Sequence, residues 1–431
     1  MNGFKYAKLS GTFLCADYCN EWDEERCDKE MKYLKELDME YIVVMSLMLK
    51  NREGKYNTGY PTKIEEAKDF YKGNDVVELL LKSAEKFGMK IFMGLNLNDE
   101  WWDLWWDLDK LEAGKEWLFN QMEIGNQMAT ELYEGYYKKY PRSFYGWYWM
   151  WECWNFPIMS LTSRGRRQAA KILSDALNIS LRHLSSLDST MPCLLSPFAN
   201  NELTTPEDLY HQWTDIFATT EFRYGDIFCA QDSCGAGGQK VKDLDAWYNA
   251  YRKAVDTVPG LRMWANNENF ESTDWSSTTI DNYVRQLQIT DKYVDVHLSF
   301  AYFHYYSPGS VFEGYHKAFK FYVENGYVSF DLPKNVTDVD VVLDEKENKA
   351  TVTWKHPDLS EIAGFRIYRN NMYIGRVTQG RIMHDGKMSH EMELKFIDSD
   401  PQTNENNKLV YSVAAYNPSG NFSRRIEKKI K

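Results

Sequence analysis

The chain has 431 residues, of which 43% are hydrophobic and 15% are aromatic, and its net charge is −12. This composition predicts a folded protein with one large domain and a smaller one, and it argues against disorder. The negative charge argues against nucleic acid as a partner, because the only Lys/Arg-rich tract is the last eight residues, which are typical of the solvated end of a strand.

Three features of the chain bear on its compartment. Residues 1–8 lack the apolar core of a signal peptide, and no run of 18 uncharged apolar residues predicts a membrane span. The seven cysteines, at positions 15, 19, 27, 153, 193, 229 and 234, are odd in number and form no CxxC pair, which is typical of reduced thiols. We therefore expect a cytoplasmic protein without membrane contact, or a secreted one if a leader has been removed. The sequence predicts no oligomeric state.

Short apolar runs alternate with helical patterns from the start of the chain to about residue 330. The predicted strands are 9–15, 41–49, 90–96, 145–152, 192–199, 226–232, 261–268 and 294–301. The predicted helices are 23–37, 74–88, 115–140, 165–187, 206–219, 240–257, 278–292 and 310–325, and in the second of these Asn74 is placed as N-cap and Gly88 as the stop. Eight strand-helix units favour an α/β fold of the (β/α)8 barrel type over an open doubly wound sheet, with residues 1–331 as the barrel domain.

A tryptophan-rich tract, residues 101–108, follows the third predicted strand. In a helix, its four indoles would share one side, leaving Asp103 and Asp107 together on another. Trp101 and Trp102 are therefore candidate sugar-binding residues at the rim of a pocket. The alternative is a helix that only packs against its neighbour. The same choice applies to the chain as a whole, because abundant aromatic residues suit either sugar stacking or a large aromatic core.

Two aromatic runs each end in a single glutamate, Glu152 after the fourth predicted strand and Glu268 after the seventh. Because side chains alternate along a strand, Glu152 shares a face with Tyr148 and Met150, while Glu268 shares one with Trp264 and Asn266. The carboxyl ends of barrel strands open into one mouth, so both glutamates can face a common pocket. Two such carboxylates are the equipment of a retaining glycosidase, although a lone strand-end carboxylate more often holds an arginine or caps a helix.

Other polar and aromatic residues fall at or just beyond predicted strand ends. The candidate substrate-binding residues of this kind are Asp17, Asn96, Asn98, Tyr148, Gln231, Asp232, Trp264, Asn266, Tyr302 and His304. Asp232 lies in a glycine-rich loop and could bind sugar hydroxyls, tune a glutamate or simply form a turn. Each of these residues could equally be a satisfied structural group.

Past residue 331 the helical period stops and alternating strands follow, at 350–354, 364–369, 373–377, 393–397 and 409–416. Residues 332–431 are therefore predicted to form a small β-sandwich domain. Residues 353–354, 364–370, 396–398 and 411–423 resemble a fibronectin type III module. The resemblance implies seven strands and an accessory role rather than chemistry.

Glutamates after the fourth and seventh strands resemble the large clan of retaining glycoside hydrolases built on this barrel. The resemblance implies that Glu152 is the acid/base and Glu268 the nucleophile. Trp151 stands where that clan usually has asparagine, so the usual partner of the sugar 2-hydroxyl is missing, and Asn266 or Asn267 could replace it. The barrel also resembles, more narrowly, a bacterial family of glycosidase-type barrels known as a domain of unknown function, on residues 9–13, 94–96, 146–152, 231–235, 264–270 and 305–308.

The motifs of several other enzyme classes are missing from the sequence. The eight histidines show no HxH or HExxH spacing, and there is no GxSxG, Walker A or GxGxxG motif. We predict no metal and no cofactor, and a carbohydrate substrate cleaved by double displacement. The alternatives are a barrel that binds carbohydrate without cleaving it and a barrel enzyme of other chemistry, such as a lyase or an isomerase.

Overall fold

The computed structural model describes residues 6–344, 346–379, 392–401 and 409–430. Residues 1–5, which belong to the N-terminal stretch without a signal-peptide core, lie outside this description. Packing divides the chain into two units: Met1–Asn269 with Arg285–Tyr302, and Phe270–Val284 with Phe303–Lys431. The second unit thus includes segments that the sequence assigned to the barrel domain, and the boundary at residue 331 stays a prediction.

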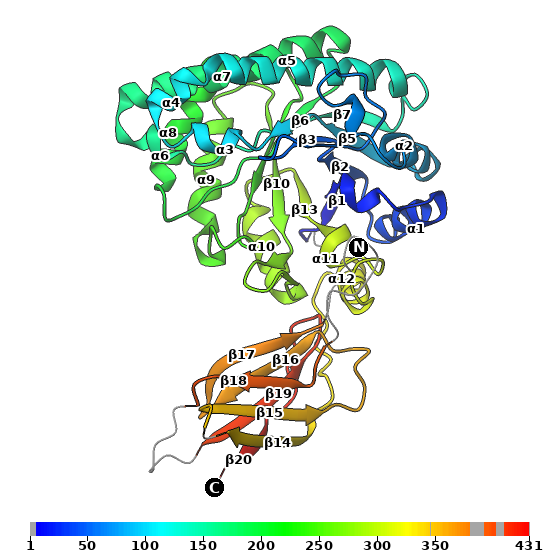
Figure 1. The fold of residues 1–431 in the computed structure, drawn as a ribbon, viewed down its shortest axis with the longest axis vertical. Helices are drawn as coiled ribbons and strands as arrows, with labels where there is room; N and C mark the ends of the chain where they lie inside the picture. Colours follow the sequence, from blue (N-terminus) through cyan, green and yellow to red (C-terminus); the bar gives the residue numbers. More distant parts are fainter. Residues whose placement is uncertain (1–5, 345, 380–391, 402–408, 431) are drawn as a thin grey trace. The chain divides into compact units, whose positions relative to one another are not determined.

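The first unit contains a closed barrel of eight parallel strands (Figure 1). The strands are β1 (Leu9–Cys15), β2 (Tyr41–Met45), β5 (Lys90–Gly94), β7 (Phe144–Trp149), β8 (Cys193–Leu195), β9 (Ile227–Gln231), β10 (Arg262–Glu268) and β13 (Val296–Phe300). They follow one another around the barrel in chain order, and β13 closes on β1. The predicted (β/α)8 barrel is confirmed, and β7 and β10 are its fourth and seventh strands.

Helices lie outside the strands, as Figure 1 shows for α2, α5, α7 and α9. The long helices are α1 (Glu24–Lys35), α2 (Val76–Phe87), α5 (Lys115–Leu132), α7 (Ser163–Leu187), α8 (Pro206–Phe217), α9 (Leu244–Val255), α10 (Ile280–Thr290) and α12 (Gly314–Asn325). The predicted N-cap Asn74 is wrong: Asp75 caps α2 by accepting from the backbone of Glu78, while Asn74 donates to the Trp22 carbonyl. Gly88 ends α2 as predicted, at φ 64°, where a side chain would be strained.

Short elements fill the loops. They are the helices α3 (Trp101–Leu104), α4 (Leu108–Ala113), α6 (Pro157–Leu161) and α11 (Tyr302–Tyr305), the single turns Ala16–Cys19, Lys68–Phe70, Tyr133–Tyr137 and Val241–Asp243, and the strands β3 (Met48–Lys50), β4 (Tyr56–Thr58), β6 (Asn96–Asn98), β11 (Phe270–Glu271) and β12 (Ser276–Ser277). Strands β4, β3 and β6 form a small sheet, and β11 pairs with β12 as a hairpin. Among the described residues, no helix has the length and apolarity that crossing a membrane requires.

The predicted alternation of side chains along β7 and β10 is confirmed. Tyr148 and Met150 from the fourth strand meet Trp264 from the seventh in one buried cluster, to which the other strands contribute Phe13, Val43, Phe92, Leu194, Ile227, Cys229 and Leu298. Trp149 and Trp151 take the opposite face and pack edge-on against Trp101. The strand parity therefore sends Glu268 toward the same side as Trp264 and Asn266.

The second unit holds two antiparallel sheets. One orders β14 (Thr337–Asp344), β15 (Lys349–Lys355) and β18 (Lys395–Asp398), and the other β17 (Met372–Thr378), β16 (Gly364–Arg369), β19 (Val410–Tyr416) and β20 (Ile426–Lys429). Buried residues of both sheets, among them Val352 and Trp354 from the first and Phe365 and Val413 from the second, form one core. The predicted all-β C-terminal region is confirmed. Strand β20 lies within the last eight residues, which the sequence indicated as the end of a strand, whereas the sequence analysis missed β14.

Candidate active site

Glu152 lies three residues beyond the end of β7 and is partly exposed. The indole Nε1 of Trp101 donates to the Glu152 carbonyl at 2.8 Å, and Gln231 Nε2 donates to Glu152 Oε1 at 3.0 Å. Burial of the carboxyl group raises the pKa of Glu152 to about 7, and the hydrogen bond from Gln231 opposes this shift. Glu152 can therefore hold or release a proton near neutral pH.

Glu268 is the last residue of β10, and only 3% of it is exposed. The backbone N–H of Ala236 donates to Glu268 Oε2 at 2.7 Å, and the backbone of Gly235 also hydrogen-bonds this carboxylate. Burial raises the pKa of Glu268, the charge of Asp232 raises it further, and the charge of Glu152 acts in the same direction. The two glutamates thus lie within electrostatic reach of each other, while the backbone donors favour the ionised form of Glu268.

A chain of hydrogen bonds links the ends of four neighbouring strands. Gln231, which holds Glu152, also donates to the Ser196 carbonyl at 2.8 Å. Asn266 Nδ2 donates to Ser196 Oγ at 3.2 Å, and the Asn266 carbonyl accepts from the backbone of Asp232 at 2.9 Å. The Oδ1 atom of Asn266 is buried and has no hydrogen-bond partner within the described chain. The network holds both glutamates in register and leaves one acceptor for a ligand.

Asp232 is fully buried beneath Glu268. Its Oδ1 accepts from the backbone of Glu268 at 3.1 Å, and its Oδ2 accepts from Asn267 Nδ2 at 2.9 Å. Asn267 in turn lies 2.9 Å from His297 Nδ1. Burial raises the pKa of Asp232, and its hydrogen bonds oppose the shift. Asp232 therefore accepts a hydrogen bond from the Glu268 backbone and raises the pKa of Glu268, while its contact with sugar stays a prediction.

The structure separates several predicted site residues from this network. Asn96 is buried and donates to the Gln121 carbonyl on α5 at 3.0 Å, and Asn98 faces Gln121 as well. Both side chains therefore fasten α5 to β6, and their contact with substrate stays a prediction. After Gly94 the chain continues into β6, which pairs with β3 in the short sheet β4-β3-β6.

The tryptophan tract is not one helix. Asp107 accepts from the backbone of Asp109 and Lys110 and so starts the new helix α4, which breaks the predicted helical spacing. Trp101 is fully buried, so its predicted place at a pocket rim is wrong. Trp102 is partly exposed and stacks on Trp154 at 5.5 Å, and Trp154 stacks on Phe198 at 5.8 Å. Asp103 forms an ion pair with Arg52, while Asp107 caps α4.

The remaining predicted residues divide between core and site. Tyr148 and Trp264 belong to the buried barrel cluster. Asp17 is partly exposed and lies two residues after the end of β1. Burial raises the pKa of the Cys15 thiol, and the charges of Asp17 and Glu152 raise it further. Tyr302 is fully buried at the end of the eighth strand, and His304 is a buried residue of the second unit.

Sequence reasoning missed the parts of the site that come from backbone groups and small side chains. These are Ser196, which joins Gln231 to Asn266, and the backbone N–H groups of Gly235 and Ala236 on Glu268. The only available signal was the glycine-rich loop 234–238, which a close backbone approach to a carboxylate would explain.

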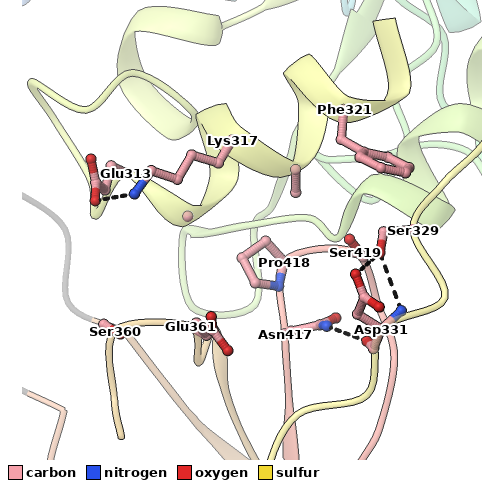
Figure 2. Close-up of a pocket in the computed structure, with 12 residues that line it drawn as sticks. Glu313, Lys317, Phe321, Ser329, Asp331, Ser360, Glu361, Asn417, Pro418 and Ser419 are labelled. Atoms are coloured by element: carbon pink, nitrogen blue, oxygen red, sulfur yellow. Dashed lines mark hydrogen bonds and ion pairs between the residues drawn. The ribbon is translucent and has the colours of Figure 1, made fainter. Parts of the chain in front are cut away.

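The second unit contains an open pocket of about 350 Å³, shown in Figure 2. Among its lining residues, Lys317 forms an ion pair with Glu313, and the Ser329 hydroxyl donates to Asp331 at 2.8 Å. It has no buried carboxylate pair. No group of three or more His, Cys, Asp or Glu residues that could hold a metal ion occurs in the described part of the chain.

Comparison with known proteins gives a family and a fold. The model of a family described as a domain of unknown function, DUF4434, matches residues 9–311, more than half of the chain. A search among curated proteins found no match. A solved structure provisionally named as an α-L-fucosidase, from Bacteroides thetaiotaomicron VPI-5482, is similar with a TM-score of 0.53 and 20% identity, over 70% of this chain and 88% of that one.

An endo-β-1,4-mannanase from Thermotoga petrophila is similar over 100% of this chain and 98% of its own, with a TM-score of 0.44 and 10% identity. That likeness is too low to support an inference. At 20% identity, the similarity to the Bacteroides protein shows the barrel fold alone.

Proposed function

This chain belongs to the DUF4434 family, and we propose that its barrel is a glycoside hydrolase that uses Glu152 and Glu268. One observation carries the proposal: two glutamates at the ends of the fourth and seventh strands of a closed parallel barrel share one hydrogen-bond network and act on each other electrostatically. Active sites of such barrels lie at the C-terminal ends of the strands. That a protein of the same fold is named as an α-L-fucosidase agrees with a glycosidic substrate.

The proposed reaction is a double displacement. Glu268 attacks the anomeric carbon while the bond to the leaving oxygen breaks, and Glu152 gives its proton to that oxygen. Glu152, now ionised, then takes a proton from water, the water oxygen attacks the anomeric carbon, and the bond to Glu268 breaks. Both carboxyl groups return to their starting states, so no metal ion or cofactor is needed.

The surroundings of the two carboxyls support this division of roles. Two backbone N–H groups on Glu268 stabilise a negative charge, which a nucleophile must carry. Glu152 is more exposed, receives one hydrogen bond from a neutral amide and has a pKa near 7, which suits a group that exchanges protons with a leaving group and with water. Both pKa values are raised, so the assignment rests on the donors and the strand positions rather than on pKa order.

Asn266 is the proposed partner of the sugar hydroxyl next to the reacting carbon. Trp151 stands at the position before Glu152 and packs against Trp101 and Trp117, away from the barrel cluster. Asn266 keeps a buried Oδ1 without a partner in the described chain, and it lies on the same face of β10 as Glu268. A sugar hydroxyl could donate to it and satisfy it.

Trp102 with Trp154, and Asp17, are further proposed sugar contacts, since they are partly exposed or stacked near the strand ends. For the C-terminal sheets we propose a fibronectin type III-like sandwich with an accessory role.

A panel of aryl glycosides and oligosaccharides, with Glu152→Gln and Glu268→Gln proteins as blanks, tests the proposal. Hydrolysis by the native chain and its loss in both variants would support it. Proton NMR of the first-formed product then assigns the mechanism: the starting anomer indicates retention, and the opposite anomer would contradict the nucleophilic role of Glu268. Full turnover in either variant would contradict the assignment of the site.

A carbohydrate-binding barrel without hydrolysis is the second candidate. Trp151 in place of the expected asparagine and the raised pKa of Glu268, which keeps part of the nucleophile neutral, favour it. Glycan binding by the native chain that leaves every glycosidic bond of the panel intact would select this candidate.

A further inference from the structure

The hairpin of β11 and β12 carries an exposed tryptophan that no role proposed so far uses. The hairpin begins with Phe270, two residues after Glu268 in the chain, and Phe270 pairs with Ser277 across it. Trp275 lies in its turn and is 55% exposed. A single exposed aromatic residue needs no explanation by itself, so the backbone and the surroundings of Trp275 decide whether it has a function.

The backbone of Trp275 is strained. Its φ is +54°, a left-handed conformation that glycine and asparagine adopt readily and that a bulky side chain rarely does. A residue strained in this way persists only where the surrounding structure over-determines it, and such residues cluster at functional sites.

The ring of Trp275 is also held flat against two others. Phe270 stacks on Trp275 with centroids 5.6 Å apart and planes at 8°, and Phe270 stacks on Tyr305 at 5.0 Å and 14°. Phe270 and Tyr305 are buried, while Trp275 is the exposed ring of the three. Three nearly parallel rings form a rigid platform with an indole at its outer end.

Arg376 on β17 fastens this turn to the sandwich. Its guanidinium donates to both carboxylate oxygens of Asp274, at 2.8 and 2.7 Å, and to Glu271 at 2.6 Å, and it reaches Thr273 and Ser276 at 3.3 and 3.2 Å. Its side chain is only 16% exposed. A planar guanidinium that bonds two carboxylates of one turn fixes the turn more firmly than a lysine could.

We propose that Trp275 is the stacking platform of a carbohydrate site carried by the second unit, that its ligand is a pyranose residue of a neutral oligosaccharide, and that Arg376 is the positioning residue that holds it. The geometry favours this ligand because a flat, preorganised indole face complements the flat C–H face of a pyranose ring. The carboxylates of the turn are engaged by Arg376, and the net charge of −12 disfavours an anionic ligand. The ligand class rests on the proposed function.

The hairpin thereby gives the sandwich a part in glycan binding. The turn that bears the platform is covalently continuous with the strand that ends in Glu268, and an arginine of the sandwich bonds it.

Glycan retention tests the platform without requiring catalysis. Full-length Glu268→Gln protein is run in native gels containing galactomannan, xyloglucan, mixed-linkage β-glucan or arabinoxylan, and the same protein with Trp275→Ala is run beside it. We expect retention by at least one polysaccharide and an affinity about tenfold lower without the indole. Tyr224→Ala is the matched control, since this tyrosine is 89% exposed and precedes β9, at the opposite end of that strand from the site.

Equal retention of the two proteins, or no retention on any polysaccharide, would overturn the inference. So would a dimer by size-exclusion chromatography that Trp275→Ala dissolves, because the indole would then be a contact between two copies. If the native chain were retained through Trp275 but cleaved no glycan, the result would contradict the proposed hydrolase and support the platform. If the native chain were active, and Trp275→Ala changed neither KM nor retention, the result would support the hydrolase and contradict the platform.

The positioning role of Arg376 has its own readout. Arg376→Met should weaken retention about as much as Trp275→Ala, and raise KM with kcat unchanged, whereas Arg376→Lys should recover part of the loss. A lower Tm with unchanged retention and KM would show that Arg376 only stabilises the fold, and this result would overturn its role.

Discussion

The ends of β7 and β10 carry the same residue after similar aromatic runs, yet they hold it in different ways. Glu152 is partly exposed and receives one side-chain hydrogen bond, from Gln231. Glu268 is buried, receives two backbone hydrogen bonds and lies above the second carboxylate, Asp232. The two carboxyls thus differ in environment rather than in residue type, and the proposed roles of proton donor and nucleophile follow this difference.

The largest effect should come from removing the carboxylate at the end of β10. Glu268→Gln should lower kcat by about 10³-fold or more on every substrate, because the variant lacks the proposed nucleophile. Steady-state kinetics on substrates with good and poor leaving groups checks this. In Glu268→Ala, added azide should restore part of the turnover and give a glycosyl azide of the anomer opposite to the substrate, whereas an inverted azide product from Glu152→Ala and not from Glu268→Ala would reverse the assigned roles.

A smaller, selective loss should follow at the end of β7. Glu152→Gln removes the proton donor, so turnover of glycosides with poor leaving groups should fall about 10²- to 10⁴-fold. For aryl glycosides whose phenol leaves without protonation, the rate of the first chemical step should fall much less. Equal losses across a series of leaving groups would contradict the role of Glu152 as general acid.

The difference between the two strand ends was only partly predictable. Parallel strands buried on both faces give short apolar runs, so all eight barrel strands and the two glutamates at their ends could be found from the sequence. Strand parity then placed Trp264 and Asn266 correctly relative to Glu268. Strand β14 was missed because charged residues interrupt its apolar pattern.

The supporting groups could not be predicted, for physical reasons that differ. Asn96 turns toward α5 because β6 leaves the barrel to pair with β3, a contact between distant segments. Ser196 and the backbone of Ala236 contribute only hydrogen bonds that depend on where the fold places them. Neither the composition nor the spacing of the sequence indicates such bonds. The helical spacing of the tryptophan tract failed because Asp107 caps a second helix inside it.

Two variants should shift the two limbs of the pH profile in opposite directions, each by about half a pH unit to one unit. Since the pKa of Glu268, about 8, lies above that of Glu152, about 7, the pKa of Glu152 sets the acid limb of kcat/KM and the pKa of Glu268 sets the alkaline limb. The hydrogen bond from Gln231 lowers the pKa of Glu152, so Gln231→Ala should raise this pKa and move the acid limb to higher pH. The charge of Asp232 raises the pKa of Glu268, so Asp232→Asn should lower this pKa and move the alkaline limb to lower pH. Shifts of both limbs in the same direction would show that the two carboxyls do not have separate roles.

The smallest expected effect is on stability, and it tests whether burial of the Glu268 carboxyl destabilises its ionised form. The folded-state pKa of Glu268 lies above its unfolded value, so its contribution to stability is fully present below the unfolded pKa and is lost as the pH rises through the folded one. Glutamine stays neutral throughout, so Glu268→Gln should raise Tm by about 2 °C or more at pH 9 and leave it nearly unchanged at pH 4. The exposed Glu66→Gln serves as control and should shift Tm at neither pH. If Glu268→Gln lowered Tm at pH 9, the ionised carboxylate would be stabilising, and the pKa of Glu268 would have to be lower in the folded than in the unfolded chain. The two backbone N–H groups would then lower this pKa by more than burial and the charge of Asp232 raise it.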